Sequence, residues 1–364
     1  MIATSRHLPR RFLACAALAW AGSGLCAEIP AEGAHRAWLE TLAHAAEARP
    51  QAVDAAIASA LRQHLCAGNT TCFTESAWRA LDARALRSKD PAVLTLAANV
   101  ASYRAAAMDL AARWAHIAAI DRDNAYPLIM QASAEWNTHH YSDAFEHFRA
   151  ALTRPRDDDQ FRAAFLLIRP FIDAAPPSLA QISPCSLSER DPGDAPAGPE
   201  LRASALFEIV SDAAFPAHLG YVMQMCKEIP AQDAARGDVC QAVGAHMAQY
   251  ATSQLSHSVG LAMQRLSSSD LQRQDAIAEQ QRRDSDELHR KLWWVQDAPD
   301  AAQRIAANEY WLEEIARVGE IAAADSLVRR FGEPPVESRA ERERRFDQRM
   351  EKAQACYARI SHDK

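Results

Sequence analysis

The stretch LAARWAHIAAIDRDNAYPLIMQA, residues 110–132, decides how this chain folds. Leu110, Trp114 and Ile117 recur at the spacing of one helix face, and the polar run DRDN at 121–124 then separates them from a second apolar stretch. A similar break, RSKDP at 87–91, precedes this unit. Breaks at this interval predict helices of about twelve to sixteen residues that pair as antiparallel hairpins.

Composition favours helix along nearly the whole chain. Alanine, leucine, arginine and glutamate dominate, whereas the alternation of β-branched or aromatic residues that is typical of strands is almost absent. The sequence therefore predicts an all-α protein. In the second half, helices are expected at 201–227 with an interruption near Pro216, at 238–267 as one longer helix, at 271–295, at 301–318 with 322–331, and at 337–360.

The helical hairpins repeat with an offset of 34 residues. When the segment from Pro91 is aligned with the segment from Ala125, apolar residues fall on equivalent positions of both hairpins. An ordinary helical bundle with accidental periodicity is the alternative interpretation. The aligned pairs are Leu94 with Leu128, Ala98 with Ala132, Leu110 with Ala144, Trp114 with Phe148, and Ile117 with Ala151.

The two hairpins, residues 91–158, resemble tetratricopeptide repeats. The stretch IAAIDRDNA at 117–125 is similar to the boundary between two such repeats, although Arg122 stands where the family usually has proline. In the second helix of the next unit, Ala144, Phe148 and Ala151 match the small, aromatic and small positions of the family. A third unit would run from about residue 57 to residue 90.

The first helix of the second unit departs from the family pattern. Gln131 and Ala132 stand where the family prefers leucine and glycine, and Trp136 lies one position beyond the usual tyrosine. The resemblance therefore covers less than a third of the chain well. It implies antiparallel hairpins stacked as a solenoid, followed by a second helical half.

Such a solenoid has a concave groove that the first helix of each hairpin lines. Aromatic and amide side chains in this groove would bind a protein or peptide partner. The alternative is that Tyr103 and Trp136 pack between helices. If the register of the resemblance holds, the groove residues are Asn99, Tyr103, Tyr126, Ser133, Trp136 and Asn137.

The N-terminus has the pattern of a secretory signal peptide. Arg6, Arg10 and Arg11 precede an apolar run at 12–21, which is too short to span a bilayer. Small residues follow, and cleavage after Ala27 is expected, which predicts a periplasmic or secreted protein. Two alternatives are lipid attachment at Cys26, which the preceding leucine disfavours, and a cytosolic protein with an apolar first helix.

The charge of the remaining chain excludes some partners. Residues 1–27 contain three arginines and no acids, so 37 basic and 47 acidic side chains remain, a formal charge of −10. This acidic balance does not favour nucleic acid as a partner. No second apolar run reaches membrane-spanning length, so no membrane span is expected in the mature chain.

Six cysteines remain after Cys15 and Cys26 leave with the signal, and an even number in an exported chain predicts disulfides. Six cysteines allow 15 connectivities, of which spacing favours one. A metal site is the alternative, but the separations lack paired C-x-x-C spacing. Two local pairs and the pair left by elimination give the expected bonds Cys66–Cys72, Cys226–Cys240 and Cys185–Cys356.

Prolines divide the expected mature chain into two helical regions. A repeat region is predicted at 28–174 and a C-terminal helical region at 200–364. Between them, six prolines in residues 175–199 exclude a long helix and predict a linker or an ordered loop.

The sequence contains no motif that indicates a particular reaction or ligand. Metalloprotease, nucleophile-elbow, phosphate-loop and calcium-loop patterns are absent. His139 and His140 lie on a turn without a nearby carboxylate or cysteine. His246 and His257 are three turns apart on the expected long helix. No metal site, cofactor or catalytic residue is therefore predicted. The sequence thus favours a binding scaffold of the cell envelope; the alternative is an enzyme whose site is assembled from scattered helical residues near His139 and His140.

Overall fold

A computed structural model describes residues 33–66, 72–104, 109–178, 198–214, 219–228 and 233–336, together with positions 341, 344, 348 and 351. The expected signal peptide, Cys185, Cys356 and most of the last expected helix lie outside these residues. Within them the chain is all-helical, as the composition predicts, and no strand occurs.

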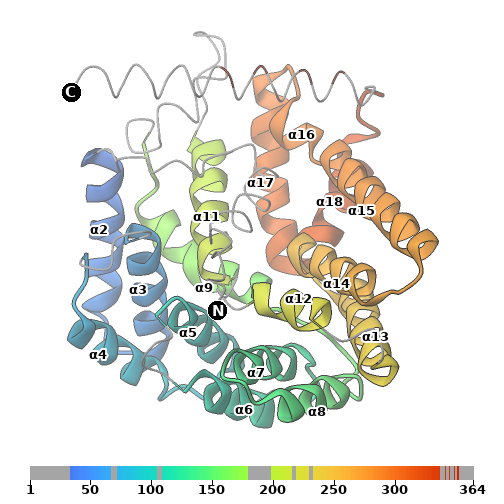
Figure 1. Cartoon of the computed structure of the whole chain (residues 1–364). Coiled ribbons are helices and arrows are strands. Elements are labelled where there is room, and N and C mark those ends of the chain that lie inside the picture. Colours follow the sequence, from blue (N-terminus) through green and yellow to red (C-terminus); the bar gives the residue numbers. More distant parts are fainter. Residues whose placement is uncertain are drawn as a thin grey trace.

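Sixteen helices make up the described part of the chain (Figure 1). They are α2 (Gly33–Glu47), α3 (Ala52–Leu65), α4 (Glu75–Ala85), α5 (Pro91–Ser102), α6 (Leu110–Ile120), α7 (Tyr126–Asn137), α8 (Tyr141–Ala151), α9 (Phe161–Ala174), α11 (Gly198–Ala214), α12 (Leu219–Lys227), α13 (Ala234–Tyr250), α14 (Gln254–Ser267), α15 (Leu271–Lys291), α16 (Trp293–Gln296), α17 (Ala301–Val318) and α18 (Glu320–Phe331).

Polar residues fix the starts of many helices. At each of these positions the side chain accepts a hydrogen bond from a backbone N–H of the first turn, which would otherwise have no partner. The capping residues are Thr74, Asp90, Asp109, Asp233, Ser253, Asp270 and Asp300.

One expected helix is divided. The single helix expected at 238–267 is two antiparallel helices, α13 and α14, because the chain turns at residues 251–253 and Ser253 caps α14. The two helices come close enough for Gly244 and Gly260 to face each other. A methyl group on either glycine would lie 2.6 Å from backbone atoms of the other helix, so only glycine fits at this crossing.

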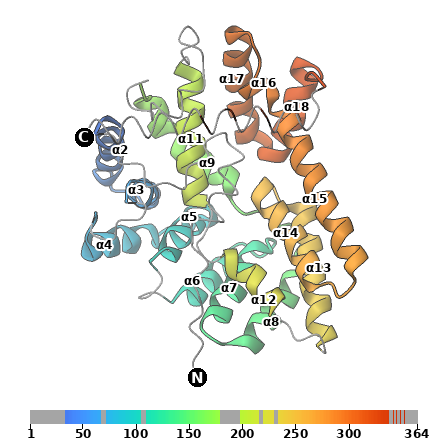
Figure 2. The ribbon, with the colours of Figure 1, turned by 45° about the horizontal axis from the view of Figure 1, so that its top comes forward.

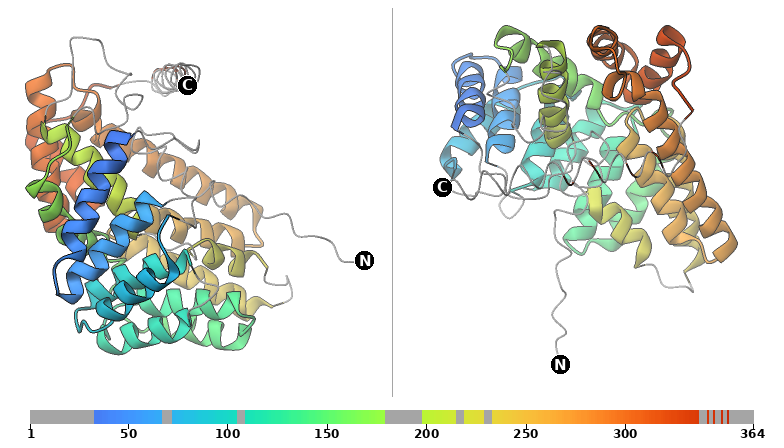
Figure 3. Two further views of the ribbon diagram at one scale, coloured as in Figure 1. Left: turned by 90° about the vertical axis from the view of Figure 1, so that its left-hand side faces the viewer. Right: turned by 90° about the horizontal axis from the view of Figure 1, so that it is seen from above.

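The helices form a curved row that folds back on itself. Helices α2 to α8 follow one another as packed neighbours, and α9 and α11 then run through the middle of the molecule (Figure 1). Helix α11 packs on α3, α5, α9 and α17, and α12 packs on α7 and α14 (Figure 2). The hairpin of α2 with α3 and the pair α17 with α18 therefore lie on opposite sides of α9 and α11 (Figure 3).

Two hydrophobic cores hold this arrangement. One contains residues of α2 to α5, α9, α11 and α15 to α18, and the other contains residues of α5 to α8 and α12 to α14. A buried ion pair adds to the first core, since Arg304 of α17 donates to Glu200 of α11 at 3.2 Å. Each core combines helices from before and after the proline-rich segment, so the two regions pack as one body.

The two local cysteine pairs are joined in the structure. Cys66 at the end of α3 bonds to Cys72, and Cys226 of α12 bonds to Cys240 of α13. Their Cα atoms are 5.5 and 5.8 Å apart, within the usual range for a disulfide. Among the described residues, no helix is both long enough and apolar enough to cross a membrane.

Candidate functional site

The six residues expected to line the groove divide into a covered set and an open set. Asn99, Tyr126 and Ser133 are buried. The covering element is part of the same chain: the side-chain amide of Asn99 donates to the carbonyl of Ala214, the last residue of α11, at 2.7 Å. Other parts of the same chain therefore cover the side chains of these three residues in this structure.

The open set is Tyr103, Trp136 and Asn137. Tyr103 follows α5 and is 39 % exposed, Trp136 is half-buried, and Asn137 is exposed. Trp136 and Asn137 close α7, so they lie at the tip of the hairpin that α7 forms with α8. The predicted binding residues that still reach solvent thus lie at the ends of helices rather than along them.

The tip of this hairpin is an aromatic turn, which we define as residues 136–141. The rings of Trp136 and Tyr141 lie 4.4 Å apart, and His139 and Tyr141 share a hydrogen bond of 2.7 Å between Nδ1 and the hydroxyl. His139 adopts a φ of 66°, a left-handed conformation that is uncommon for a residue other than glycine. The turn is therefore ordered, although five of its six residues are exposed.

The four histidines considered in the sequence analysis do not form a common site. His139 and His140 are exposed on the aromatic turn and belong to no group of three metal-ligating side chains among the described residues. His246 and His257 lie on separate helices, α13 and α14, because the expected long helix is divided. His257 is hydrogen-bonded to the carbonyl of Ala248 and to Asp284, at 2.7 and 3.0 Å.

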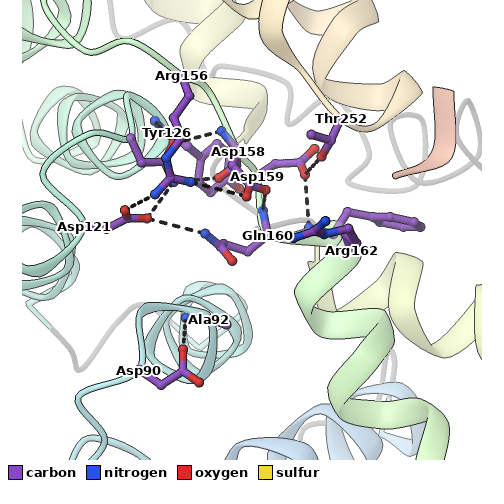
Figure 4. Close-up of polar contacts among 12 residues, drawn as sticks. Asp90, Ala92, Asp121, Tyr126, Arg156, Asp158, Asp159, Gln160, Arg162 and Thr252 are labelled. Atoms are coloured by element: carbon purple, nitrogen blue, oxygen red, sulfur yellow. Dashed lines mark hydrogen bonds and ion pairs between the residues drawn. The ribbon is translucent and has the colours of Figure 1, made fainter. Parts of the chain in front are cut away.

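Acidic and hydroxyl side chains meet between the segment before α9 and the turn between α13 and α14 (Figure 4). We call this the polar hub, and its centre is Asp159. The Asp159 carboxylate accepts hydrogen bonds from the hydroxyls of Thr252, Ser253 and Ser256 and from the backbone N–H of Phe161. One carboxylate thus ties the segment before α9 to the turn between α13 and α14.

A second layer of the hub ties two inter-helix segments together. The Asn124 side chain donates to the carbonyl of Asp158 at 2.8 Å and accepts from its backbone N–H at 2.9 Å. Arg156 pairs with Asp121 (Figure 4). These contacts join the segment between α6 and α7 to the segment between α8 and α9, and they give the hub a structural role.

Two acids in the hub hold their protons more tightly than usual. Asp157 is 1 % exposed, and no described residue donates a hydrogen bond to either of its carboxylate oxygens. Burial, followed by the charges of Asp159 and Asp158, raises the pKa of Asp157 to about 8. Burial and the charge of Asp159 also raise the pKa of Glu320, to about 7, against a hydrogen bond from the backbone of Gln254.

A second polar group, the histidine cluster, consists of His35 on α2, His64 on α3, and Glu208 and Asp212 on α11. One ligating atom each of His35, His64 and Glu208 lie within 4.8 Å of one another. Burial lowers the pKa of His64, but the hydrogen bond and charge of Asp212 and the charge of Glu208 outweigh burial and raise that pKa to about 9. These atoms form the one group suited to a metal ion that we find among the described residues.

Sequence reasoning missed the histidine cluster because its members are far apart along the chain. His64 and Asp212 are separated by 148 positions, so no motif joins them. The only local signal is that Glu208 and Asp212 lie four residues apart, on one face of α11.

A small pocket lies between α3, α4 and α5. Trp78, Asp82, Val100 and Arg104 are among its lining residues. The guanidinium of Arg104 lies 4.2 Å from the centre of the Trp78 ring, and it also pairs with Glu75. The pocket has room for little more than a water molecule, so it does not suit an organic substrate.

Comparison with known proteins leaves the function to the geometry of these sites, because no protein family model, no curated protein and no solved structure matches this chain.

Proposed function

We propose that this chain is an exported helical-repeat protein that binds a protein partner in the cell envelope, and that the partner contacts the aromatic turn. The proposal combines a repeat architecture, an oxidised cysteine pattern and one exposed aromatic surface. Each of these rests on different residues.

The repeat architecture is supported by the burial of equivalent positions. All ten residues that the 34-residue offset pairs, from Leu94 to Ala151, are buried in the same core. Helices α5 and α7 have twelve residues each, and α6 and α8 have eleven each. We therefore interpret α5 to α8 as two units of a tetratricopeptide-like solenoid, and α3 with α4 as a third.

In this interpretation the chain fills its own groove. Helices α3, α5 and α7 are the first helices of the three units. Helix α11 packs on α3 and α5, and α12 packs on α7. A peptide cannot occupy the same face without displacing α11 or α12 from the cores. Binding is therefore assigned to the edge of the solenoid, where the hairpin tips reach solvent.

The observation that carries the proposal is the exposed, ordered aromatic turn. Tryptophan and tyrosine are enriched among the side chains that dominate binding energy at protein interfaces. A left-handed His139 costs conformational energy that the surrounding contacts must offset, and such strain is concentrated at functional sites. The turn thus offers a preformed surface of rings and amide groups to a protein partner.

The cysteine pattern supports the compartment. Disulfides persist in oxidising compartments, and the two local pairs are bonded in the structure. With the basic and apolar N-terminus, this pattern supports export to the periplasm or beyond.

Site-specific photocrosslinking tests the proposal. A benzoyl-phenylalanine is placed at position 141 or, as a matched control, at position 250; the two tyrosines are 42 % and 43 % exposed, and Tyr250 lies on α13 outside the aromatic turn. We expect irradiation of the expressing cells to give one discrete adduct from position 141 and none from position 250. The same adducts from both positions would contradict the proposal.

A second variant distinguishes binding by Trp136 from the alternative in which Trp136 only packs between helices. Trp136→Ala, in the background that carries the crosslinker at 141, should reduce the adduct roughly tenfold, as expected for loss of an interface anchor. A fall in melting temperature with an unchanged adduct would assign Trp136 to packing against Phe145 and Tyr141 alone.

A further inference from the structure

We propose that His35, His64 and Glu208 bind one divalent transition-metal ion of the zinc class, with Asp212 orienting His64 behind it. This site is separate from the aromatic turn and does not depend on the proposed partner. It is argued from the geometry of four side chains on three helices.

The donor atoms already converge. His64 Nε2 lies 3.7 Å from Glu208 Oε1, and all three candidate donor atoms lie within 4.8 Å of one another. Two donors bound to one tetrahedral zinc ion are roughly 3.3 Å apart, because each Zn–N or Zn–O bond is about 2.0–2.1 Å. His64 and Glu208 are therefore close to ligand spacing, and His35 completes the set by a small side-chain rotation on the first turn of α2.

Asp212 has the place of a supporting carboxylate. It is hydrogen-bonded to His64 Nδ1 at 2.6 Å, which leaves Nε2 as the atom that faces Glu208 and His35. Histidines that bind metals nearly always donate their other ring N–H to such a group, which fixes the ring and makes the donor nitrogen more basic. In the neutral imidazole that a metal requires, this hydrogen bond keeps the proton on Nδ1 and leaves Nε2 as the donor.

The surrounding fold holds these groups in place. His64 lies at the end of α3, two residues before the Cys66–Cys72 disulfide. Glu208 and Asp212 lie one turn apart on α11, which is anchored in the first core. The helix that covers the predicted groove therefore also supplies two of the four side chains.

The donor set selects the ion. Two imidazoles with one carboxylate suit zinc and similar transition metals, whereas calcium and magnesium require oxygen donors. Three protein ligands leave one coordination position for water or a substrate, as in catalytic rather than structural zinc sites. The polar hub has only oxygen donors, and the Asp159 oxygens are occupied by hydroxyl and backbone donors, so it does not offer an equivalent site.

The alternative is that the cluster is only an ion-paired histidine with no affinity for metal. To separate the two, the full chain is produced without a histidine tag, stripped with EDTA and titrated with ZnCl2 by calorimetry. Bound zinc is counted by mass spectrometry after gel filtration. We expect one zinc ion per chain, and a tetrahedral absorption spectrum when Co²⁺ is used instead.

Three variants assign the binding to these residues. Glu208→Gln and His35→Gln should each weaken zinc binding at least tenfold, and circular dichroism should show unchanged helix content because both side chains reach solvent. His44→Gln is the matched control, since His44 is on the same helix as His35 and bonds to Glu47 outside the cluster. Absence of zinc binding, or equal affinity in Glu208→Gln and in the wild type, would overturn the proposal.

Discussion

The polar hub and the histidine cluster are both made of charged side chains from distant parts of the chain, but they differ in the atoms that they bring together. In the hub, three hydroxyl groups and one backbone N–H donate to the oxygens of Asp159. In the histidine cluster, His64 Nδ1 is hydrogen-bonded to Asp212, and Nε2 faces Glu208 Oε1 at 3.7 Å. The protein's own donors occupy the oxygens of Asp159, whereas the second arrangement brings two imidazoles and a carboxylate to within reach of one ion.

This difference shows how structural and binding roles can be separated without a related protein. A buried carboxylate that accepts several hydrogen bonds stabilises the fold, because removing it leaves its donors unsatisfied. Donor atoms that converge but remain too far apart to bond to one another gain more free energy from a shared ligand than from each other. The following predictions test this contrast, from the largest expected effect to the smallest.

Removing the centre of the hub should have the largest effect. Asp159→Ala leaves the hydroxyls of Thr252, Ser253 and Ser256 without their acceptor in a buried site, and relief of repulsion with Asp157 offsets only part of this loss. We expect the free energy of unfolding to fall by about 3–5 kcal/mol in urea titrations. The control Asp123→Ala, at an exposed position of the segment before α7, should change it by less than about 0.5 kcal/mol. Equal losses of unfolding free energy in the two variants would contradict a structural role for the hub.

Substitution of Asp157 should change the free energy of unfolding in the opposite direction, and the size of this change should depend on pH. Its raised folded pKa means that its contribution is most favourable below the unfolded pKa near 3.8 and is lost as pH rises through about 8. Asp157→Asn should therefore stabilise the protein, and the gain should grow by roughly 2 kcal/mol between pH 5 and pH 7. Denaturant titrations of both proteins at the two pH values measure this. A gain that does not change with pH would show that Asp157 is ionised and paired in the folded state.

Asp212 should affect metal binding more than it affects the fold. Asp212→Asn keeps the shape of the side chain but weakens its hold on His64 Nδ1. Loss of such a supporting carboxylate typically lowers metal affinity by about 10- to 100-fold, and we expect zinc affinity to fall in that range, together with a modest loss of stability of the zinc-free protein because the ion pair with His64 is weakened as well. The reverse pattern, a large loss of stability with unchanged zinc affinity, would make the cluster a second structural hub.

Much of the N-terminal fold could be predicted from the sequence because local patterns specify it. The polar break at 121–124 separates α6 from α7, and the paired apolar positions are buried as the repeat register requires. The division of 238–267 was missed, since alanine and other helix formers surround the turn and only the capping Ser253 marks it.

The burial of Asn99 and the histidine cluster could not be predicted in this way. Asn99 is buried by α11, which lies 115 positions away at Ala214, and no local pattern encodes that contact. His35 and His64 are far along the sequence from Glu208 and Asp212, the carboxylates on α11 that complete the cluster. Such sites depend on how the chain folds back, which helix periodicity does not specify.

The contrast between the two regions is tested most directly by a crystal soaked in ZnCl2 and measured on both sides of the zinc absorption edge. We predict one strong anomalous peak between His35, His64 and Glu208, and none within the polar hub around Asp159. A peak at the hub, or no peak at the histidine cluster, would contradict the account.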